Sequence, residues 1–355
     1  MKILHVSRTM GQGGAEKIVY QLCKDNDGHV QCIASTGGIY EEKLEKQNIK
    51  HFIIPDIDGK NPFQMMKCFK LLKKIIKEEK IDIIHTHHRM AAFYARIIKM
   101  FKTNLVHVYT AHNVFNNKRF FMRFALKNAK IVAVGQGVKN NLVDVYGICS
   151  EDIEVIYNSI VPNKTDTQVC QEIDKERKNG KIIIGNIGRI TEQKGIDIFL
   201  KAISKIVKVR KDIYAVIVGD GEAMQSMQHM ADELNIRENV CFLGYRSDVF
   251  NIISQLDFVV LSSRWEGFPL TPIETFSMGK TIVASDIDGN NEIVNHMQNG
   301  LLFDKEDIDD LANKIQLMLS DTRMRLELEE KAMETFEKHF SYSVFIQKYN
   351  EVYNK

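Results

Sequence analysis

The sequence predicts an α/β protein made of two doubly wound, parallel-sheet domains. Three observations lead to this prediction. A chain of 355 residues is long enough for two domains of ordinary size. Short apolar runs alternate with helical patterns, and several runs are apolar on both faces, as parallel strands covered by helices must be. The same opening, a strand followed by a glycine-bearing loop and a helix, occurs at the start of each half.

Strand-like apolar runs occur in both halves of the chain. The first half has runs at residues 3–6, 30–34, 52–54, 81–84, 105–109 and 131–134. The second half has runs at 182–187, 213–218, 240–243, 258–261 and 281–284. Residues 162–180 are polar and weakly patterned, which indicates a linker followed by a first helical segment. We therefore expect one domain over residues 1–162, a second over 163–334, and an aromatic-rich helix over 335–355.

Composition excludes several classes of protein. The six cysteines are widely spaced and form no Cys-x-x-Cys pair, which favours reduced thiols over a disulfide framework or a zinc site. The first residues turn polar too early for a signal peptide. No run of about 18 apolar residues occurs, so we expect no membrane-spanning helix. These features predict a cytoplasmic protein.

Charge is distributed unevenly along the chain. Residues 60–130 contain 16 basic and 3 acidic side chains, although the whole chain has a net charge of only +2. Within this region, residues 61–80 read as a helix with apolar residues on one face and lysines beside them. Phenylalanines and basic residues are mixed again between Phe115 and Phe124. This pattern indicates either a basic, aromatic surface for an anionic membrane or lipid-linked phosphate, or core stripes with solvated lysines. Because no nucleic-acid-binding motif accompanies the charge, we expect no nucleic-acid partner.

The chemistry of open α/β sheets takes place in the loops after the strands, so these loops hold the candidate residues. The first is residues 11–16, which include Gly13 and Gly14. A dinucleotide fingerprint needs a sixth-position glycine, where this chain has Glu16, and no acid follows the second strand. NAD binding is therefore rejected. The loop fits either a close approach to a phosphate or an ordinary tight turn.

A second loop, after the strand-like run 182–187, carries two cations. Arg189 and Lys194 lie between Gly188 and Gly195, before a helix. Two cations and free backbone N–H groups form a suitable cradle for a diphosphate, and fixed positive charge stabilises a departing diphosphate. The ordinary alternative is a pair of solvated surface cations.

A third loop contains two carboxylates eight residues apart. Glu266 and Glu274 bracket a segment with one glycine and two prolines that leads into a helix. Each carboxylate can accept two hydrogen bonds from adjacent hydroxyl groups of a sugar or ribose. The ordinary alternative is a helix start with two surface acids.

Histidines form the last candidate group. His85, His87 and His88 follow one strand-like run, and His112 follows the next. Three histidines raise the idea of zinc, but no cysteine or acid lies nearby in the sequence, so we predict no metal. His112 could hydrogen-bond a sugar hydroxyl. For His5, His85 and His107, whose neighbours are strand-like, a purely structural role is a serious alternative.

Taken in chain order, these residues resemble family 4 of the retaining glycosyltransferases, group 1 enzymes of the GT-B fold, of the bacterial cell-surface polysaccharide type. The resemblance spans nearly the whole chain and rests on the segments 13–16, 85–96, 111–113, 155–158, 188–195, 218–221, 266–274 and 299–303. The Glu-x7-Glu pair and the Arg…Lys loop are its most specific parts. One departure is Asn158-Ser159-Ile160-Val161, where the family often reads Asn-Gly-Val-Asp, and no role is drawn from it.

The resemblance implies two Rossmann-like domains facing across a cleft, with the last helix crossing back to the N-terminal domain. The catalytic residues it implies are His112, Arg189, Lys194 and Glu266. The donor-binding residues are Gly13, Gly14, Gly188, Arg189, Lys194, Gly219, Glu266, Gly267, Phe268, Pro269, Leu270 and Glu274. The acceptor-side residues are His87, Arg89 and His112.

The implied reaction moves a hexose-type sugar from a UDP-linked donor to a hydroxyl group of a glycan or lipid-linked acceptor, with retention of configuration. We expect no metal and no other cofactor, because the two cations take the metal's place. We also expect peripheral contact with the inner face of the cell membrane through residues 60–130. Three alternatives are a nucleotide-sugar epimerase, a glycogen-type phosphorylase or synthase, for which the chain is short, and a silent binding subunit, which would not need the cation loop and the glutamate pair.

Overall fold

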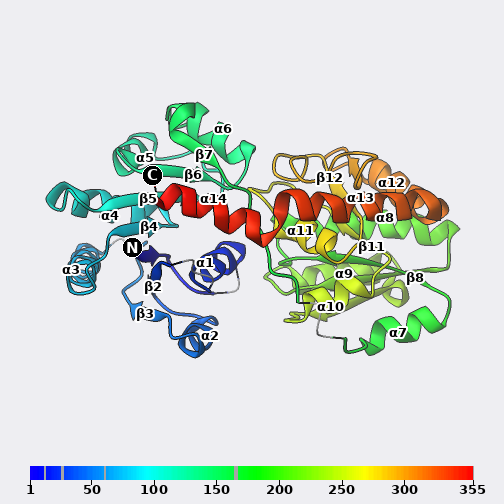
Figure 1. The fold of residues 1–355 in the computed structure, drawn as a ribbon. Coiled ribbons are helices and arrows are strands. Elements are labelled where there is room, and N and C mark those ends of the chain that lie inside the picture. Colours follow the sequence, from blue (N-terminus) through cyan, green and yellow to red (C-terminus); the bar gives the residue numbers. More distant parts are fainter. Residues whose placement is uncertain (12, 25–27, 60, 164–166, 355) are drawn as a thin grey trace. The chain divides into compact units, whose positions relative to one another are not determined.

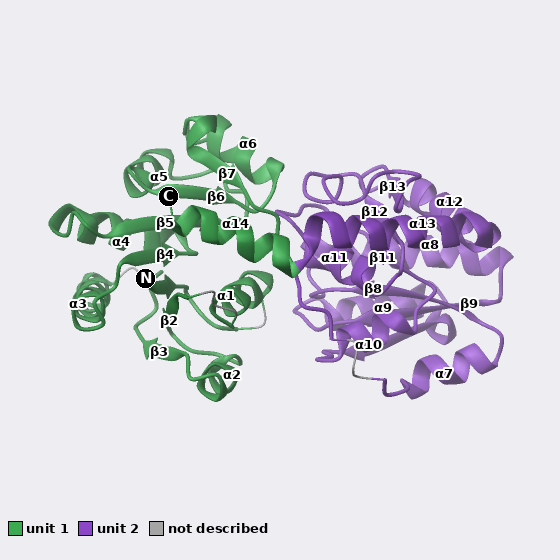
Figure 2. Cartoon of the chain, viewed as in Figure 1, with its two compact units in different colours: residues 1–159, 342–355 green, residues 160–341 purple. Residues whose placement is uncertain are grey.

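The computed structural model describes the chain except residues 12, 25–27, 60, 164–166 and 355. It contains two compact units, coloured separately in Figure 2. Unit 1 comprises residues 1–159 and 342–355, and unit 2 comprises residues 160–341. The sequence predicted the first boundary at residue 162, three residues beyond the end of unit 1.

Unit 1 contains a seven-stranded parallel sheet in the order β3-β2-β1-β4-β5-β6-β7 (Figure 1). Its strands are β1 (Lys2–Val6), β2 (Val30–Ser35), β3 (Lys50–Ile53), β4 (Ile83–Thr86), β5 (Val106–Ala111), β6 (Lys130–Ala133) and β7 (Ile153–Val155). Its helices are α1 (Gly14–Lys24), α2 (Glu41–Lys46), α3 (Pro62–Glu78), α4 (Arg89–Phe101), α5 (Arg119–Leu126), α6 (Gln136–Asp144) and α14 (Tyr342–Asn354).

Unit 2 contains a six-stranded parallel sheet in the order β10-β9-β8-β11-β12-β13. Its strands are β8 (Ile182–Ile187), β9 (Ile213–Val218), β10 (Val240–Gly244), β11 (Phe258–Leu261), β12 (Ile282–Ser285) and β13 (Leu301–Phe303). Its helices are α7 (Gln171–Lys178), α8 (Ile196–Val209), α9 (Met224–Glu233), α10 (Val249–Ser254), α11 (Leu270–Ser277), α12 (Ile308–Ser320) and α13 (Thr322–Thr335).

The predicted fold class is confirmed: both units are doubly wound parallel sheets. Two strands were not predicted, β7 and β13. Each has three residues and lies at a sheet edge, so neither contains an apolar run long enough to stand out from a loop. The predicted single helix over 335–355 is wrong, because α13 runs to Thr335 and is followed by a π-helical turn, Phe336–Phe340, and a separate helix, α14.

Helices cover both faces of the unit 1 sheet. On one face, Leu4 and Ile84 of the sheet pack with Leu72 of α3 and Ile98 of α4. Helix α14, red in Figure 1, lies against the other face, where the Tyr353 hydroxyl contacts His85 of β4. Side chains alternate between faces along a strand, which is why Ile84 and His85 point to different helices.

Strand order changes direction at one point in each sheet. In unit 1 the chain proceeds outward from β1 through β2 and β3, then returns to the other side of β1 with β4. In unit 2 the same reversal occurs between β8 and β11. Ligands of open α/β sheets bind beyond the carboxyl ends of the strands at such a switch point. The loops after β1, β4, β8 and β11 are therefore where functional groups are expected.

Candidate functional site

In unit 2, the loops after β8 and β9 meet backbone to backbone at the carboxyl edge of the sheet. A β-carbon added to Gly219 would lie 1.9 Å from the carbonyl oxygen of Gly188, and Gly219 has a φ of +140°. A side chain at Gly219 would therefore force the two loops apart. This close packing fixes the start of the loop that carries Arg189 and Lys194.

The loops after β8 and β11 bring Lys194 and Glu266 together. The Lys194 ammonium donates to Glu266 Oε1 at 2.5 Å, and the two side chains are only 15% and 6% exposed. Ser263 Oγ donates to the same oxygen at 2.7 Å, and the Gln193 amide nitrogen lies 3.3 Å from Glu266 Oε2. The carboxylate is thus held by several donors at the switch point of the sheet, as a group that must be pre-positioned for a ligand would be.

Arg264 ties the same two loops together, and the sequence analysis missed it. Its guanidinium donates two parallel hydrogen bonds of 2.9 Å to the carboxylate of Asp197, at the start of α8. It also donates to Glu306 at 2.8 Å and to the Glu192 carbonyl at 2.8 Å. Bidentate arginine–carboxylate pairs combine strength with a fixed geometry. Nothing in the sequence spacing indicates this pair, because the partners are 67 residues apart.

The remaining predicted donor residues surround this pair. Arg189 is exposed, and no hydrogen bond or ion pair of its guanidinium is found within the described part of the chain. Glu274 is buried in the second turn of α11, which begins at Leu270 directly after Pro269. The backbone before α11 is tightly packed, since a β-carbon on Gly289 would lie 2.7 Å from the Gly267 carbonyl oxygen.

Phe268 faces the interior of unit 2 rather than solvent. It is buried, and its ring lies 6.0 Å from the ring of Phe340 in the π-helical turn. The Phe268 side chain therefore points away from any ligand at the carboxyl edge, so that Phe268 could contact such a ligand only through its backbone.

In unit 1, His5 of β1 lies close to His87, directly after β4, and His87 lies close to His112, directly after β5. His5 Nδ1 lies 3.0 Å from His87 Nε2, and His87 Nδ1 lies 3.0 Å from His112 Nε2. Because both nitrogens of His87 are engaged within the protein, His87 has no nitrogen left for direct contact with an acceptor. His112, at the end of β5, is half-buried and is the member of the row nearest the carboxyl edge.

Burial controls the charge of these histidines. It lowers the pKa of His5 and of His112 to about 4 and that of His87 well below its ordinary value, with the neighbouring histidines lowering the last further. Removal from water disfavours the charged imidazolium. All three rings are therefore neutral near pH 7.

The structural interpretation holds for the histidines inside strands. His85 is fully buried, with Nδ1 2.8 Å from the Tyr353 hydroxyl and Nε2 2.8 Å from Thr110 Oγ1. His107, on the other face, has its Nε2 2.9 Å from Thr86 Oγ1. His5, His85 and His87 are close enough to suggest a metal group, but both nitrogens of His85 already have partners. His88 is occupied elsewhere, as its Nδ1 caps α4 by accepting from Met90 N–H.

The other predicted residues of unit 1 lie near the same edge. Gly14 begins α1, and a β-carbon on Gly13 would collide with the Glu16 carboxylate. Arg89, the first residue of α4, donates to Asn117 at 2.7 Å, and its guanidinium stacks 3.8 Å from the centre of the Phe115 ring. The arrangement leaves Arg89 partly exposed.

Comparison with known families explains this division into two halves. Residues 12–164 match the model described as Glycosyltransferase Family 4, and residues 171–335 match the model described as Glycosyl transferases group 1. The two matches together leave only the ends of the chain and a short central segment uncovered. The chain belongs to the group 1, family 4 glycosyltransferases. The family resemblance predicted from the sequence is therefore confirmed, and so is the GT-B fold.

Relatives of this glycosyltransferase match almost end to end. An Escherichia coli protein named UDP-Gal:alpha-D-GlcNAc-diphosphoundecaprenol alpha-1,3-galactosyltransferase is 27% identical over 345 residues, covering 90% of this chain and 88% of the relative. A glycosyltransferase from Rickettsia africae superposes with a TM-score of 0.87 at 27% identity, covering 99% and 97% of the two chains. Anabaena Alr3699/HepE in complex with UDP has a TM-score of 0.86 at 21% identity over both full chains, which supports the fold.

Unit 1 of this glycosyltransferase also exposes apolar side chains on α3, α4 and α5, and the solvent-exposed sides of these three helices are here called the α3–α5 face. Its exposed apolar side chains are Phe63, Met66, Met100, Phe101, Phe120 and Phe124. The predicted apolar stripe of α3 therefore divides: Leu72 and Ile76 enter the core, whereas Phe63 at the start of the helix is 86% exposed. Among the described residues, no helix has the length and apolar character needed to cross a bilayer.

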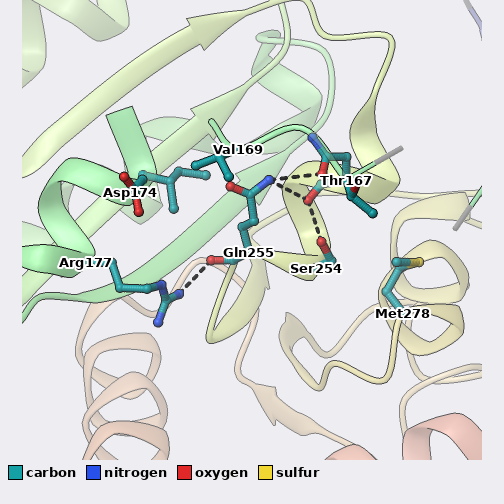
Figure 3. A pocket seen from close by; sticks show the side chains of 9 residues that line it. Thr167, Val169, Asp174, Arg177, Ser254, Gln255 and Met278 are labelled. Carbon is teal, nitrogen blue, oxygen red and sulfur yellow. Dashed lines mark hydrogen bonds between the residues drawn. The ribbon is translucent and has the colours of Figure 1, made fainter. Parts of the chain in front are cut away.

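A pocket of about 390 Å³ lies elsewhere in unit 2, between the start of α7 and α10 (Figure 3). Two hydrogen bonds connect residues that line it. Arg177 donates to the Gln255 carbonyl at 2.7 Å, and the Gln255 side-chain amide donates to the Asn251 carbonyl at 3.1 Å. Gln255 precedes β11, so this pocket is at the amino end of that strand. It lies away from the carboxyl edge that carries Lys194 and Glu266.

Proposed function

We propose that this glycosyltransferase transfers a hexose-type sugar from a UDP-linked donor to a hydroxyl group of a glycan or lipid-linked acceptor, with retention of configuration. We place the reaction in cell-surface polysaccharide synthesis, including capsule. The names of the matching relatives support this class: one is a galactosyltransferase acting on a diphosphoundecaprenol-linked sugar, and another is a Klebsiella pneumoniae protein of the cps region.

The observation that carries the proposal is the Lys194–Glu266 pair at the switch point of unit 2, with the exposed Arg189 on the same loop. Without a donor, Glu266 neutralises Lys194. A diphosphate brings two negative charges that compete for the lysine, so the ammonium would turn towards the phosphates and join Arg189 there. Glu266 would then be released to accept hydrogen bonds from sugar hydroxyl groups.

The start of α11 would complete the donor site. Its first backbone N–H groups have no partners within the helix and suit an anion. Glu274, one turn further along the helix, would accept hydrogen bonds from the two ribose hydroxyl groups. The backbone of Gly267 to Leu270 would lie between the sugar and the phosphates.

In the proposed reaction the acceptor hydroxyl attacks from the face that the diphosphate leaves. The bond between the anomeric carbon and the β-phosphate oxygen breaks, and a bond from that carbon to the acceptor oxygen forms. The acceptor proton passes to the departing diphosphate. Arg189 and Lys194 stabilise the charge that develops on the diphosphate, so the mechanism needs neither a metal nor another cofactor. No carboxylate nucleophile is invoked.

Unit 1 would supply the acceptor side. His112 would lie near the transferred sugar, Arg89 near the acceptor, and the Gly13–Gly14 turn near the donor. The α3–α5 face would contact an anionic membrane surface, because exposed phenylalanines insert at the interface while lysines and arginines bind lipid phosphates. Such contact would keep the enzyme on the inner face of the membrane, where a lipid-linked acceptor is found.

The test of the donor site is saturation-transfer NMR of the purified chain with a panel of nucleotide sugars and free nucleotides. We expect binding of one UDP-sugar, lost in Glu274→Ala and kept in the control Glu327→Ala, which changes an exposed glutamate of α13 in the same unit. Thermal unfolding of both variants checks that the buried position tolerates alanine. If no nucleotide or nucleotide sugar binds, the proposed donor site is wrong and a silent subunit becomes the better interpretation. Release of free monosaccharide from the bound donor without an acceptor would instead indicate an epimerase.

A further inference from the structure

The histidine row in unit 1 continues to a fourth residue, Gln31 of β2. Gln31 Oε1 lies 2.8 Å from His5 Nε2, at the opposite end of the row from His112. The row therefore reads Gln31, His5, His87, His112, with link lengths of 2.8, 3.0 and 3.0 Å. Gln31, His5 and His87 are buried, whereas His112 is only half-buried, at the carboxyl edge of the sheet.

Neutral histidines give such a row a direction. A neutral imidazole carries one N–H, so one ring nitrogen donates and the other accepts. If a ring donates on one side of the row, it must accept on the other. Each link therefore fixes the next one, and the tautomer at one end of the row determines the tautomer at the other end.

Gln31 decides that direction. Its amide oxygen can only accept, so His5 must carry its proton on Nε2 and accept at Nδ1. His87 then donates from Nε2 to His5 and accepts at Nδ1, and His112 donates from Nε2 to His87. We propose that Gln31, His5 and His87 are positioning residues that fix the tautomer of His112, so that its Nδ1 is presented as a hydrogen-bond acceptor at the carboxyl edge of unit 1.

His85 supports the row without being a link in it. Its ring packs 4.1 Å from the ring of His87, but its two nitrogens face Tyr353 and Thr110. Thr110 in turn lies 3.1 Å from the hydroxyl of Tyr349, on the same helix, α14, as Tyr353. His85 and Thr110 thus connect the ring of His87 to α14, and the burial of Gln31, His5 and His87 keeps water away from the links between them. A metal ion would have to break the His5–His87 link and would still lack a third free nitrogen.

The fixed tautomer limits what His112 can bind. This consequence rests on the proposed function, in which His112 lies near the transferred sugar. An unprotonated Nδ1 accepts a hydrogen bond from a sugar hydroxyl group and repels a carbonyl or acetamido oxygen. The row therefore assigns a hydrogen-bond donor, such as a sugar hydroxyl group, as the partner of His112 Nδ1.

The direct test is NMR of the full chain labelled with ¹⁵N in its histidine rings, near pH 7. Long-range ¹H–¹⁵N correlations distinguish a protonated from an unprotonated ring nitrogen, and a His112→Gln spectrum assigns the signals. We expect His112 to be protonated at Nε2 and bare at Nδ1. A proton on Nδ1, or a mixture of tautomers in the unaltered protein, would overturn the proposal. Added Zn²⁺ is expected to leave these signals unchanged, whereas stoichiometric loss of the His5 and His87 signals would show that the cluster is a metal site instead.

Variants of Gln31 test the direction of the row. Gln31→Glu keeps an acceptor oxygen and should preserve the His112 tautomer, whereas Gln31→Met removes it and should produce a mixture. The matched control is Thr86→Val, which removes the partner of His107 on the other face of the sheet and should leave His112 unchanged. An unaltered His112 tautomer in folded Gln31→Met would contradict the role of Gln31. If that variant does not fold, the spectrum of the unaltered protein still decides the proposal.

The tautomer and the proposed function can fail separately. With half of the molecules in the wrong tautomer, Gln31→Met should weaken donor affinity about twofold, since only the competent fraction binds. Gln31→Glu should restore it. If the NMR tautomer is as expected but His112→Ala binds and turns over the donor normally, the role of His112 in the proposed function is wrong while the row stands. If His112 instead carries its proton on Nδ1, the proposed row is wrong, whatever donor binding and turnover are measured.

Discussion

The two units share one topology but differ in the groups at their switch points. In unit 1 the switch point between β1 and β4 is occupied by neutral, buried histidines that hydrogen-bond one another. In unit 2 the switch point between β8 and β11 is occupied by charged groups, Lys194 with Glu266 and Arg264 with Asp197. The same fold thus carries two different kinds of side-chain cluster, one neutral and one charged, to which our proposal assigns sugar hydroxyl groups and a diphosphate respectively.

The stabilities of the two units should therefore depend on different conditions. The stability of unit 1 should depend on pH, because its buried histidines are protonated more readily in the unfolded chain than in the folded one. The stability of unit 2 should depend on the geometry of the charged groups in the ion pairs that join its loops. The contrast between the two units therefore has consequences for pH dependence, catalysis, stability and surface binding.

Mildly acidic pH should destabilise unit 1 before it destabilises unit 2. The folded pKa of His5 and of His112 is about 4 and that of His107 about 3, below the ordinary 6.5 that applies in the unfolded chain. The unfolded chain therefore binds more protons as pH falls below 6.5, and the free energy of unfolding decreases until the folded pKa values are reached. At pH 5.5 these three histidines should lower it by about 4 kcal/mol in total.

Hydrogen exchange followed by mass spectrometry at pH 7.5 and 5.5, corrected for intrinsic exchange rates, measures this effect. Peptides of β1, β4 and β5 should lose protection while those of β8 and β9 keep it. Carboxylates such as Asp248, whose pKa Arg246 lowers to about 2 by hydrogen bonding, weaken unit 2 only at lower pH. Equal loss in both units would remove the proposed contrast.

Removal of either cation from the unit 2 loop should reduce catalysis most strongly. Lys194→Ala and Arg189→Ala should each lower kcat/KM on the order of 10²-fold, because a fixed charge on the departing diphosphate is lost. Steady-state assays with the donor identified by NMR measure this. Lys205→Ala, which removes an exposed ion pair of α8 in the same unit, serves as control and should leave the rate unchanged. A normal rate in either cation variant would end its proposed role.

Arg264→Lys should weaken unit 2 although it keeps the charge. A lysine cannot reproduce the two parallel hydrogen bonds to Asp197 together with the bond to Glu306, so we expect a loss of about 1–2 kcal/mol. The single tryptophan of the chain, Trp265, reports unfolding of this unit by fluorescence in urea. The control Arg323→Lys alters an exposed pair and should change stability by less than about 0.5 kcal/mol. Equal stabilities for the two variants would show that the bidentate pair contributes nothing special.

The smallest expected effect is on membrane binding by the exposed surfaces of the two units. Phe120→Ser on the α3–α5 face should weaken binding to vesicles containing anionic lipid by roughly 1 kcal/mol, about fivefold, since partial insertion recovers part of the 1.5–3 kcal/mol of a fully buried phenylalanine. Leu326→Ser removes an exposed apolar side chain of unit 2 and should have no effect. Vesicle co-sedimentation measures both. Unchanged binding of the phenylalanine variant, or equal losses, would refute a membrane role specific to unit 1.

Local patterns were sufficient for most of the fold. All eleven apolar runs correspond to strands, because a parallel strand covered on both faces must be apolar along its length. The pattern was insufficient where an element is short or interrupted, as in the edge strands β7 and β13 and at the break between α13 and α14. The candidate site residues were proposed in the same way, since the fold class implies that the loops after the strands carry the functional groups.

Sequence patterns were enough to predict the two doubly wound sheets, the family, and the loops that carry Lys194 and Glu266. The pair of Arg264 with Asp197, and the row of Gln31, His5, His87 and His112, are evident only in the folded chain. Period-two alternation marks Gln31 and His5 as polar positions on strands, but not as neighbours. Their contact arises because parallel strands place residues from distant parts of the chain side by side, and that register is set by the packing of the whole sheet.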